Sequence, residues 1–300
     1  MCPSFSFSAC RALNPLMILQ VVGILLLLLL STSGQPDVPV HSELLEAGTS
    51  WKASAADCPR EAKVLSYNIG HSGGSELKRL TAALRDDREI GGAIVLGLQE
   101  VDRNKKRTGN VNMARQIAEE LDMAYAWAAP PPVDDRKEEE TGVAILSRYP
   151  MKDIERIVLP NRGPGGRRRA AVGATICICD REIRVYSVHV ENRMDPEPKL
   201  AQISAVLESL GKFPKHSRAI VLGDLNTTSE RNSEDTRRVF SSAGFSTPLS
   251  DDLRTWRIMM IELRLDWLWL RDLSAVESGV ARQITFSDHF PVWARIRLEP

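Results

Sequence analysis

Side chains that bind metal ions or transfer protons recur at the ends of apolar segments in this sequence. Runs such as VLSYNI, IVLGLQE and IVLGDLN end on an amide or a carboxylate, and imidazoles stand at two further places. The residues are Asn68, Glu100, His189, Asn192, Asp224, Asn226, Asp266, Asp288 and His289. Any one of them alone is weak evidence, because a lone Glu after a strand is usually solvated. Together they predict one site where several strand ends converge.

Hard-cation chemistry suits this set of side chains. Buried ionised acids need partners or a cation, and carboxylate and carbonyl oxygens are the ligands that Mg²⁺, Mn²⁺ and Ca²⁺ prefer. No Cys/His spacing typical of zinc is present. A His oriented by an Asp adds a group that can act as acid, base or cation near neutral pH.

Short apolar strands with interspersed helices must position these residues. The pattern predicts strands at 62–69, 93–98, 142–147, 170–178, 182–190, 219–222, 263–270 and 291–298, and helices at 75–87, 111–121, 198–210 and 233–242. Residues 130–140 and 161–169 are predicted to be long surface loops. This order indicates an α+β or layered α/β architecture, and the span 61–300 is long enough for one substantial core.

The composition excludes several classes of protein. Hydrophobic residues make up 43% and charged residues 26%, which excludes a mostly disordered chain. Lys+Arg and Asp+Glu both number 39, so the formal net charge is zero. A strongly basic, non-specific nucleic-acid binder is therefore not expected.

The ordered motifs resemble one known superfamily. YNI, LQEVD, GVAILSR, the His of SVHVEN, GDLN, LDWLWL and SDHFPV follow one another between about residues 62 and 298. The set is similar to that of the endonuclease/exonuclease/phosphatase superfamily, which includes pancreatic-type deoxyribonuclease, abasic-site endonucleases, sphingomyelinases and inositol polyphosphate phosphatases. The resemblance implies a four-layer α/β sandwich, with two packed mixed β-sheets flanked by helices. It also implies divalent-metal-dependent hydrolysis of a phosphate ester.

The resemblance further implies a metal centre. Glu100 matches the metal-binding carboxylate, Asn68 matches the amide that supports the metal site, and Asp288 resembles a further acid of the same region. The implied cofactor is Mg²⁺, with Mn²⁺ or Ca²⁺ as alternatives.

Five residues match catalytic positions of the superfamily. Asp224 matches the residue that orients or deprotonates the attacking water, and Asn226 the amide that helps to hold it. His289 matches the imidazole that contacts the scissile phosphate, and Asp266 its orienting carboxylate. His189 aligns with a general acid of the deoxyribonuclease branch.

Substrate contacts are expected at the rim of this site. Asn192 resembles a phosphate-contacting amide. Arg107 and Arg169 stand in two basic runs, KKR and RRR, near the motifs. Each run reads either as solvated loop charge or as a contact to phosphate or an anionic headgroup, and these two arginines are the best rim candidates.

Departures from the superfamily narrow the function. Val221 and Leu222 precede GD where inositol phosphatases have a Trp, which argues against an inositol polyphosphate phosphatase. No long hydrophobic hairpin stands out as a membrane-inserting loop of the kind found in secreted sphingomyelinases. Trp267 and Trp269 share one face of a strand, which favours core packing over lipid binding. The first hypothesis is a phosphodiesterase of nuclease type. A phospholipid or sphingomyelin phosphodiesterase is the alternative, and a catalytically idle binding module is the third. We expect a nucleic acid or phospholipid substrate, no dedicated protein partner, and a monomer.

The N-terminal segment bears on location. Leu16–Leu30 is apolar apart from Gln20, but a membrane-spanning helix needs about 20 such residues. We therefore expect 1–34 to be an export signal or an N-terminal anchor, 35–60 a linker, and 61–300 the catalytic domain. The protein is then secreted or periplasmic, or alternatively tethered to a membrane.

The cysteines are predicted to play no essential structural role. Cys177 and Cys179 lie two apart in a strand-like run and favour small core residues over a metal pair. Without 1–34 the only other cysteine is Cys58, and this odd number leads us to expect no essential disulfide.

Overall fold

The computed structural model describes residues 41–49, 58–70, 72–133, 140–214 and 217–298. From Pro39 onward the chain forms one compact unit. The expected export signal or anchor at 1–34 lies outside the described residues. None of the helices in the described ranges is long and apolar enough to cross a membrane.

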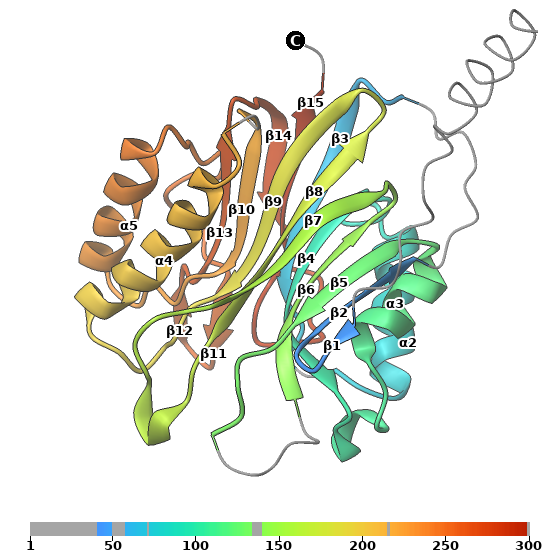
Figure 1. Cartoon of the computed structure of the whole chain (residues 1–300), viewed down its shortest axis with the longest axis horizontal. Helices are drawn as coiled ribbons and strands as arrows, with labels where there is room; N and C mark the ends of the chain where they lie inside the picture. Colours follow the sequence, from blue (N-terminus) through green and yellow to red (C-terminus); the bar gives the residue numbers. More distant parts are fainter. Residues whose placement is uncertain (1–40, 50–57, 71, 134–139, 215–216, 299–300) are drawn as a thin grey trace, which may run out of the picture. The chain divides into compact units, whose positions relative to one another are not determined.

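Two β-sheets form the centre of this unit (Figure 1). The first sheet is eight-stranded, and β3 and β4 are its parallel neighbours. Its order is β1 (His41–Ser42), β2 (Leu45–Thr49), β5 (Ala124–Ala128), β6 (Glu140–Ser147), β4 (Val95–Arg103), β3 (Glu61–Asn68), β15 (Val292–Arg297) and β14 (Ala275–Val280).

The second sheet is five-stranded, with β9 and β10 parallel to each other. Its order is β13 (Asp266–Arg271), β10 (Ala219–Asp224), β9 (Arg181–His189), β8 (Ala170–Ile178) and β7 (Met151–Val158). A separate hairpin consists of β11 (Trp256–Ile258) and β12 (Ile261–Leu263).

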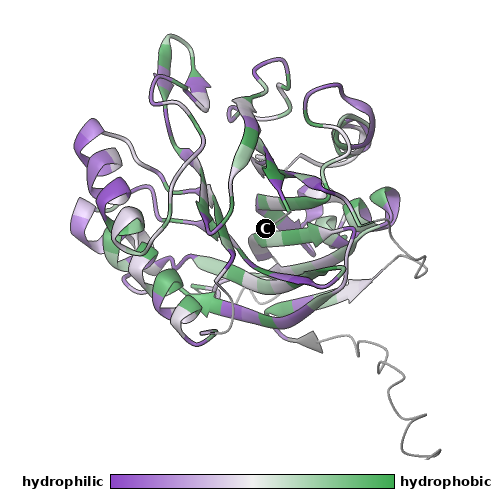
Figure 2. Ribbon diagram, turned by 90° about the horizontal axis from the view of Figure 1, so that it is seen from above, coloured by the Kyte–Doolittle hydropathy of each residue, from purple (hydrophilic) through white to green (hydrophobic). Residues whose placement is uncertain are grey.

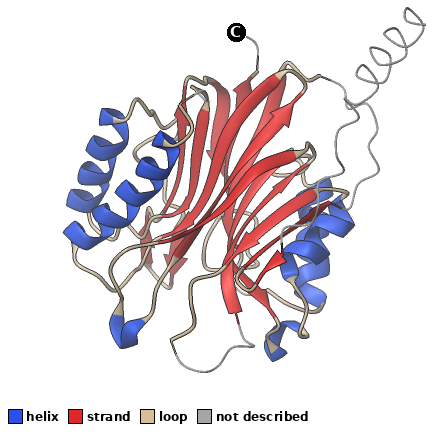
Figure 3. Ribbon diagram, viewed as in Figure 1, coloured by secondary structure: helices blue, strands red, loops and turns tan. Residues whose placement is uncertain are grey.

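Helices cover the outer face of each sheet, which completes four layers (Figure 3). The helices α2 (Ser75–Asp86) and α3 (Met113–Leu121) pack on the first sheet, and α4 (Pro196–Gly211) and α5 (Glu230–Ser242) pack on the second. Two short 3₁₀ turns, η1 (Lys106–Thr108) and η2 (Pro164–Gly166), lie in loops. The predicted four-layer α/β sandwich is confirmed.

Apolar periodicity explains these layers. In α2 the buried residues include Leu77, Leu80 and Leu84, spaced three and four apart on one helix face. In β3 alternate residues face opposite cores: Val64 packs between the sheets and Leu65 packs against the helices. Strands that are buried on both faces read as nearly continuous apolar runs. Figure 2 shows the same division, with hydrophobic colour on the strands and on the helix faces next to them.

The topology brings strand ends together at one edge of the sandwich. The strands β3, β4, β9 and β10 end at or near Asn68, Glu100, His189 and Asp224. Because β13 is antiparallel to β10, its first residue, Asp266, pairs with Asp224 at this same end. Five elements from both sheets therefore deliver polar side chains to one place.

The predicted linker at 35–60 is corrected in part by the structure. Residues 41–42 and 45–49 form β1 and β2, and β2 pairs with β5 at the edge of the first sheet. The buried carboxylate of Glu46 accepts hydrogen bonds from Arg103, Arg115 and Tyr125. The strand LEAGT is too short to show a clear apolar alternation, and its partners lie far along the chain.

Two of the three cysteines for which no essential disulfide was expected are joined in the structure. Cys58 and Cys179 form a disulfide across a sequence separation of 121 residues. Cys58 precedes β3 of the first sheet, and Cys179 lies in the turn between β8 and β9 of the second. The bond therefore links the two sheets at the end opposite to the converging strand ends. Cysteine parity in the sequence could not show this proximity.

Candidate active site

Asp224 occupies the centre of the converging side chains. Its Oδ2 accepts a hydrogen bond from Asn68 Nδ2 at 3.1 Å and lies 3.5 Å from His189 Nε2 and 3.7 Å from His289 Nε2. The carboxylate is buried, and burial raises its pKa above the ordinary value. One amide and two imidazoles thus surround an acid that is well suited to accept a proton.

The GDLN motif holds Asp224 in this position. A Cβ added to Gly223 would lie 2.0 Å from Val188 O, and the φ of Gly223 is 145°, so the chain needs glycine here. The backbone N–H of Asn226 donates to Asp224 Oδ1 at 3.0 Å, while its side-chain amide donates to Val190 O at 2.8 Å. Asn226 therefore holds Asp224 through its backbone and fixes the turn to β9 through its side chain.

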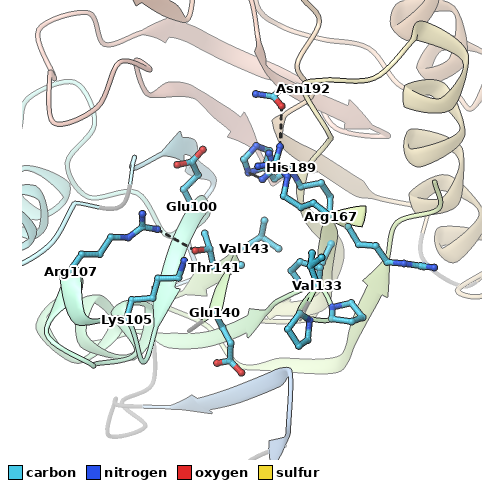
Figure 4. A pocket seen from close by; sticks show the side chains of 17 residues that line it. Glu100, Lys105, Arg107, Val133, Glu140, Thr141, Val143, Arg167, His189 and Asn192 are labelled. Atoms are coloured by element: carbon cyan, nitrogen blue, oxygen red, sulfur yellow. Dashed lines mark hydrogen bonds between the residues drawn. The ribbon is translucent and has the colours of Figure 1, made fainter. Parts of the chain in front are cut away.

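Asn68 and Glu100 lie side by side at the ends of β3 and β4. Asn68 Nδ2 donates to Glu100 Oε1 at 3.3 Å, and Asn68 Oδ1 accepts from the N–H of Gly70 at 3.1 Å. Glu100 has a φ of 59°, and the register with β6 shifts between Gln99 and Val101. A bulge of this kind redirects one side chain of a strand. Gln99 stays in the core, and Glu100 points into the site (Figure 4).

His289 is held by Asp266. Its Nδ1 lies 2.8 Å from Asp266 Oδ2, and the same oxygen accepts from Thr255 Oγ1 at 2.7 Å. Burial alone would lower the pKa of His289, but the nearby carboxylates of Asp266 and Asp224 raise it to about 10. The imidazole is therefore protonated at neutral pH, with Nε2–H directed toward Asp224 and the site.

His189 is held differently. Arg169 Nη1 lies 3.4 Å from His189 Nδ1. Arginine can only donate, so Nδ1 is the acceptor and Nε2 carries the proton that faces Asp224. Burial, and then the charge of Arg169, lower the pKa of His189 well below its ordinary value. The two imidazoles therefore differ in charge at neutral pH.

A cavity of about 500 Å³ opens beside Glu100 and His189 (Figure 4). Its lining includes the three predicted rim residues, Arg107, Arg169 and Asn192. Arg107 donates to the buried carboxylate of Asp102 at 2.7 and 3.0 Å. The other basic side chains that line it are Lys105, Arg167 and Arg168. Basic side chains therefore line this cavity beside Glu100, with Arg107 paired to buried Asp102 and Arg167 and Arg169 paired to buried Glu191.

The donor set of the site fits a divalent cation. Glu100 offers oxygen ligands, and the buried carboxylate of Asp224 is linked to it through Asn68 Nδ2, which donates to both acids. Asp266 Oδ1 is also buried and accepts no hydrogen bond from the described residues. Ligand atoms of Asp224, Asp266 and His289 lie within 4.8 Å of one another. Since His289 and Asp266 already bind each other, Glu100 is the better ligand, and Asn68 supports it through Nδ2.

Asp288 contacts the β11–β12 hairpin through its side chain and its backbone. Its Oδ2 accepts from Trp256 Nε1 at 2.7 Å, and its backbone oxygen accepts from the N–H of Arg257 at 2.9 Å. The observed contacts tie Asp288 to the β11–β12 hairpin and not to Glu100 or Asn68.

Three supporting residues escaped the sequence reasoning. Thr255 holds Asp266 through its hydroxyl group, and nothing in the local sequence signals this contact. Glu191 is fully buried and accepts from Arg167 and Arg169; its place between His189 and Asn192 in SVHVEN could have drawn attention to it. Lys199 is buried in α4 and donates to Asn226 O at 2.9 Å.

Solved structures share this fold. An endonuclease/exonuclease/phosphatase from Beutenbergia cavernae DSM 12333 superposes with a TM-score of 0.65 at 19% identity, over 80% of this chain and 72% of that chain. A family protein from Leptotrichia buccalis C-1013-b gives a TM-score of 0.60 at 21% identity, over 79% and 100%. TDP2 from Caenorhabditis elegans gives 0.59 at 19% identity, over 79% and 74%.

Sequence comparison gives the family. No curated protein sequence matches significantly. Residues 63–259 match the family described as the PGAP2IP C-terminal nuclease-like domain, within the exo/endo/phosphatase group. This match covers most of the chain and contains Asn68, Glu100, His189 and Asp224. The chain therefore belongs to this nuclease-like family and carries the fold of the endonuclease/exonuclease/phosphatase superfamily.

Proposed function

We propose that this protein is a divalent-metal-dependent hydrolase that cleaves phosphate esters, with phosphodiesters as its substrates. The observation that carries the proposal is the arrangement around Asp224, where a buried acid, two imidazoles of unlike charge and the Asn68–Glu100 pair meet. The cationic cavity beside them supports the same function, because a phosphate ester is an anion.

Each side chain has a definite task in this proposal. Glu100, oriented by Asn68, would hold the cation, which neutralises phosphate charge and stabilises the transition state when bound. Asp224, with its raised pKa, accepts the proton of the attacking water. Protonated His289, oriented by Asp266, contacts a phosphate oxygen and supplies the proton that the leaving oxygen takes up as its bond to phosphorus breaks. His189 keeps its neutral Nε2–H directed at the same place.

A substrate panel tests this proposal. The purified protein is assayed with Mg²⁺ on DNA, RNA, sphingomyelin, phosphatidylinositol and phosphomonoesters. We expect turnover of at least one diester class and little turnover of the monoesters. Binding of a diester without turnover of any substrate would contradict the proposal and favour the catalytically idle module.

We also propose that the enzyme works outside the cytoplasm, with 1–34 as its export signal. The apolar run at Leu16–Leu30 motivates this proposal, and the Cys58–Cys179 disulfide supports it, because disulfides persist in oxidising compartments. A mature chain that begins near Gln35, recovered in the soluble extracytoplasmic fraction, is the expected result of N-terminal sequencing. A chain that begins at Met1 and resists carbonate extraction of membranes would instead favour a tethered enzyme.

A further inference from the structure

The β11–β12 hairpin ends in four exposed apolar side chains. Ile258, Met259, Met260 and Ile261 are 45%, 86%, 97% and 55% exposed. We call these four residues the apolar tip. They are consecutive, so their side chains form one patch at the end of a two-stranded finger. The sequence showed no long hydrophobic hairpin, and this short one is visible only once its strands are paired.

The turn at this tip is made by residues poorly suited to it. Ile258 pairs with Ile261, so Met259 and Met260 are the two turn residues. Met259 has a φ of 49°, a left-handed conformation that favours glycine or asparagine in two-residue hairpin turns. A large apolar side chain in this position is both strained and solvated. Turn formation therefore does not explain it, which points to a role for the side chain itself.

The root of the hairpin is joined to the catalytic segment. Trp256 forms a β-bridge with His289, and its indole N–H donates to Asp288 Oδ2 at 2.7 Å. Met259 follows Trp256 by three positions, a span of roughly 10 Å in a strand. The hairpin lies at the edge where the catalytic strands end (Figure 1). A surface that binds the apolar tip is therefore held roughly 10 Å from Trp256, which adjoins the catalytic His289.

We propose that the apolar tip inserts into the surface of a phospholipid bilayer and so presents the site to lipid headgroups. Amphipathic elements lie about 5–10 Å into this interface, a depth that matches the length of the hairpin. Arg257 and Arg282 both lie over the ring of Phe290 near the root, where they can meet anionic headgroups, and Arg282 also pairs with Glu262. A finger of four side chains is too small for a stable protein interface, which buries about 800 Å² per partner.

This inference narrows the substrate class and in that respect rests on the proposed function. Insertion of the tip selects phosphate esters that are part of membrane lipids over those of free nucleic acid. Docking itself requires no catalysis, so the two claims can fail separately.

A fluorescent probe at the tip tests the docking. In the full chain, Met259 is replaced by a solvatochromic amino acid, and vesicles of phosphatidylcholine with phosphatidylserine are added. The matched control places the same amino acid at Val276, an exposed apolar residue at the far end of β14. We expect a blue shift at position 259 and none at 276. Because the signal is local, the apolar run at Leu16–Leu30 does not affect it. No shift at 259, or equal shifts at both positions, would overturn the proposal.

A second variant separates docking from folding. Met259→Gly relieves the turn, so thermal stability should be unchanged or higher. Partitioning into the vesicles is measured on residues 35–300, which retain the compact unit and lack the apolar run. Met259→Gly combined with Met260→Ser should weaken this partitioning by at least about tenfold. Undiminished partitioning would also overturn the proposal. Hydrolysis of soluble bis-p-nitrophenyl phosphate is measured on the wild-type sample. Absent turnover with a retained blue shift would count against the proposed function and leave docking intact.

Discussion

The replacement Asp266→Asn tests how the two imidazoles differ. Asp266 Oδ2 lies 2.8 Å from His289 Nδ1, and its charge is the main reason that the pKa of His289 is raised from 6.5 to about 10 despite burial. Asparagine has a similar shape but no charge. The charges of Asp224 and Asp288 still oppose burial, so the pKa of His289 falls from about 10 toward its ordinary value.

The size of the effect follows from two losses. A His with a pKa of about 6.5 or less is protonated in at most about a tenth of molecules at pH 7.5. Loss of a preorganised transition-state contact costs about 10²–10³ in rate. We therefore expect Asp266→Asn to lower the rate of diester hydrolysis by at least about 10²-fold at pH 7.5.

The pH profile makes this prediction specific. As pH falls to about 5.5, His289 of the variant regains its proton, so the rate ratio of wild type to variant should narrow by about tenfold. Asp251→Asn, which neutralises an exposed acid paired with Arg237, is the control and should keep the wild-type profile. A rate ratio that does not change with pH would refute the claim that Asp266 keeps His289 protonated.

Three further predictions concern the metal, acid stability and the disulfide. Glu100→Gln should abolish turnover at low Mg²⁺ and leave thermal unfolding nearly unchanged; equal turnover of variant and wild type across a Mg²⁺ titration would contradict this. Burial raises the pKa of Glu46, but hydrogen bonds from Arg115 and Tyr125 outweigh it and lower the pKa to about 2 from 4.5. Ionised Glu46 therefore stabilises the folded state above about pH 4.5, and this contribution is lost as pH falls toward 2. Glu46→Gln should therefore lower the free energy of unfolding by on the order of 2 kcal/mol at pH 7. In urea unfolding, the free energy of the variant should also fall less steeply with pH below about 4.5, and the same decline as in the wild type would rule this out. Cys58→Ser should lower the free energy of unfolding by up to about 4–5 kcal/mol, because the Cys58–Cys179 loop is long, and should leave hydrolysis at low temperature intact; loss of activity in a folded variant would count against it.

Secondary structure was predictable where apolar periodicity was long. The strand at 170–178 matches β8 in full, and the stripe of α3 was visible in the sequence. The strand β5 (AYAWA) was missed because it is short and alanine-rich, and β7 was missed because its exposed edge carries Lys152 and Asp153. Such strands are specified by their neighbours in the sheet more than by their own pattern.

The site was predictable at the level of residue type and less so at the level of contact. Polar residues at the ends of buried strands correctly indicated which side chains meet, because parallel strands end at one edge. The sequence could not show that Asp288 binds the hairpin, that Thr255 holds Asp266, or that Lys199 reaches Asn226. These contacts depend on loop paths, which carry no periodic signal.

The most direct test of the account is the hydrolysis of bis-p-nitrophenyl phosphate by the purified full-length protein, measured with Mg²⁺ and with excess EDTA, alongside His289→Ala. The account predicts turnover only with the metal, and a rate at least about 10²-fold lower in the variant. Equal turnover in EDTA, or a His289→Ala variant as fast as wild type, would contradict it.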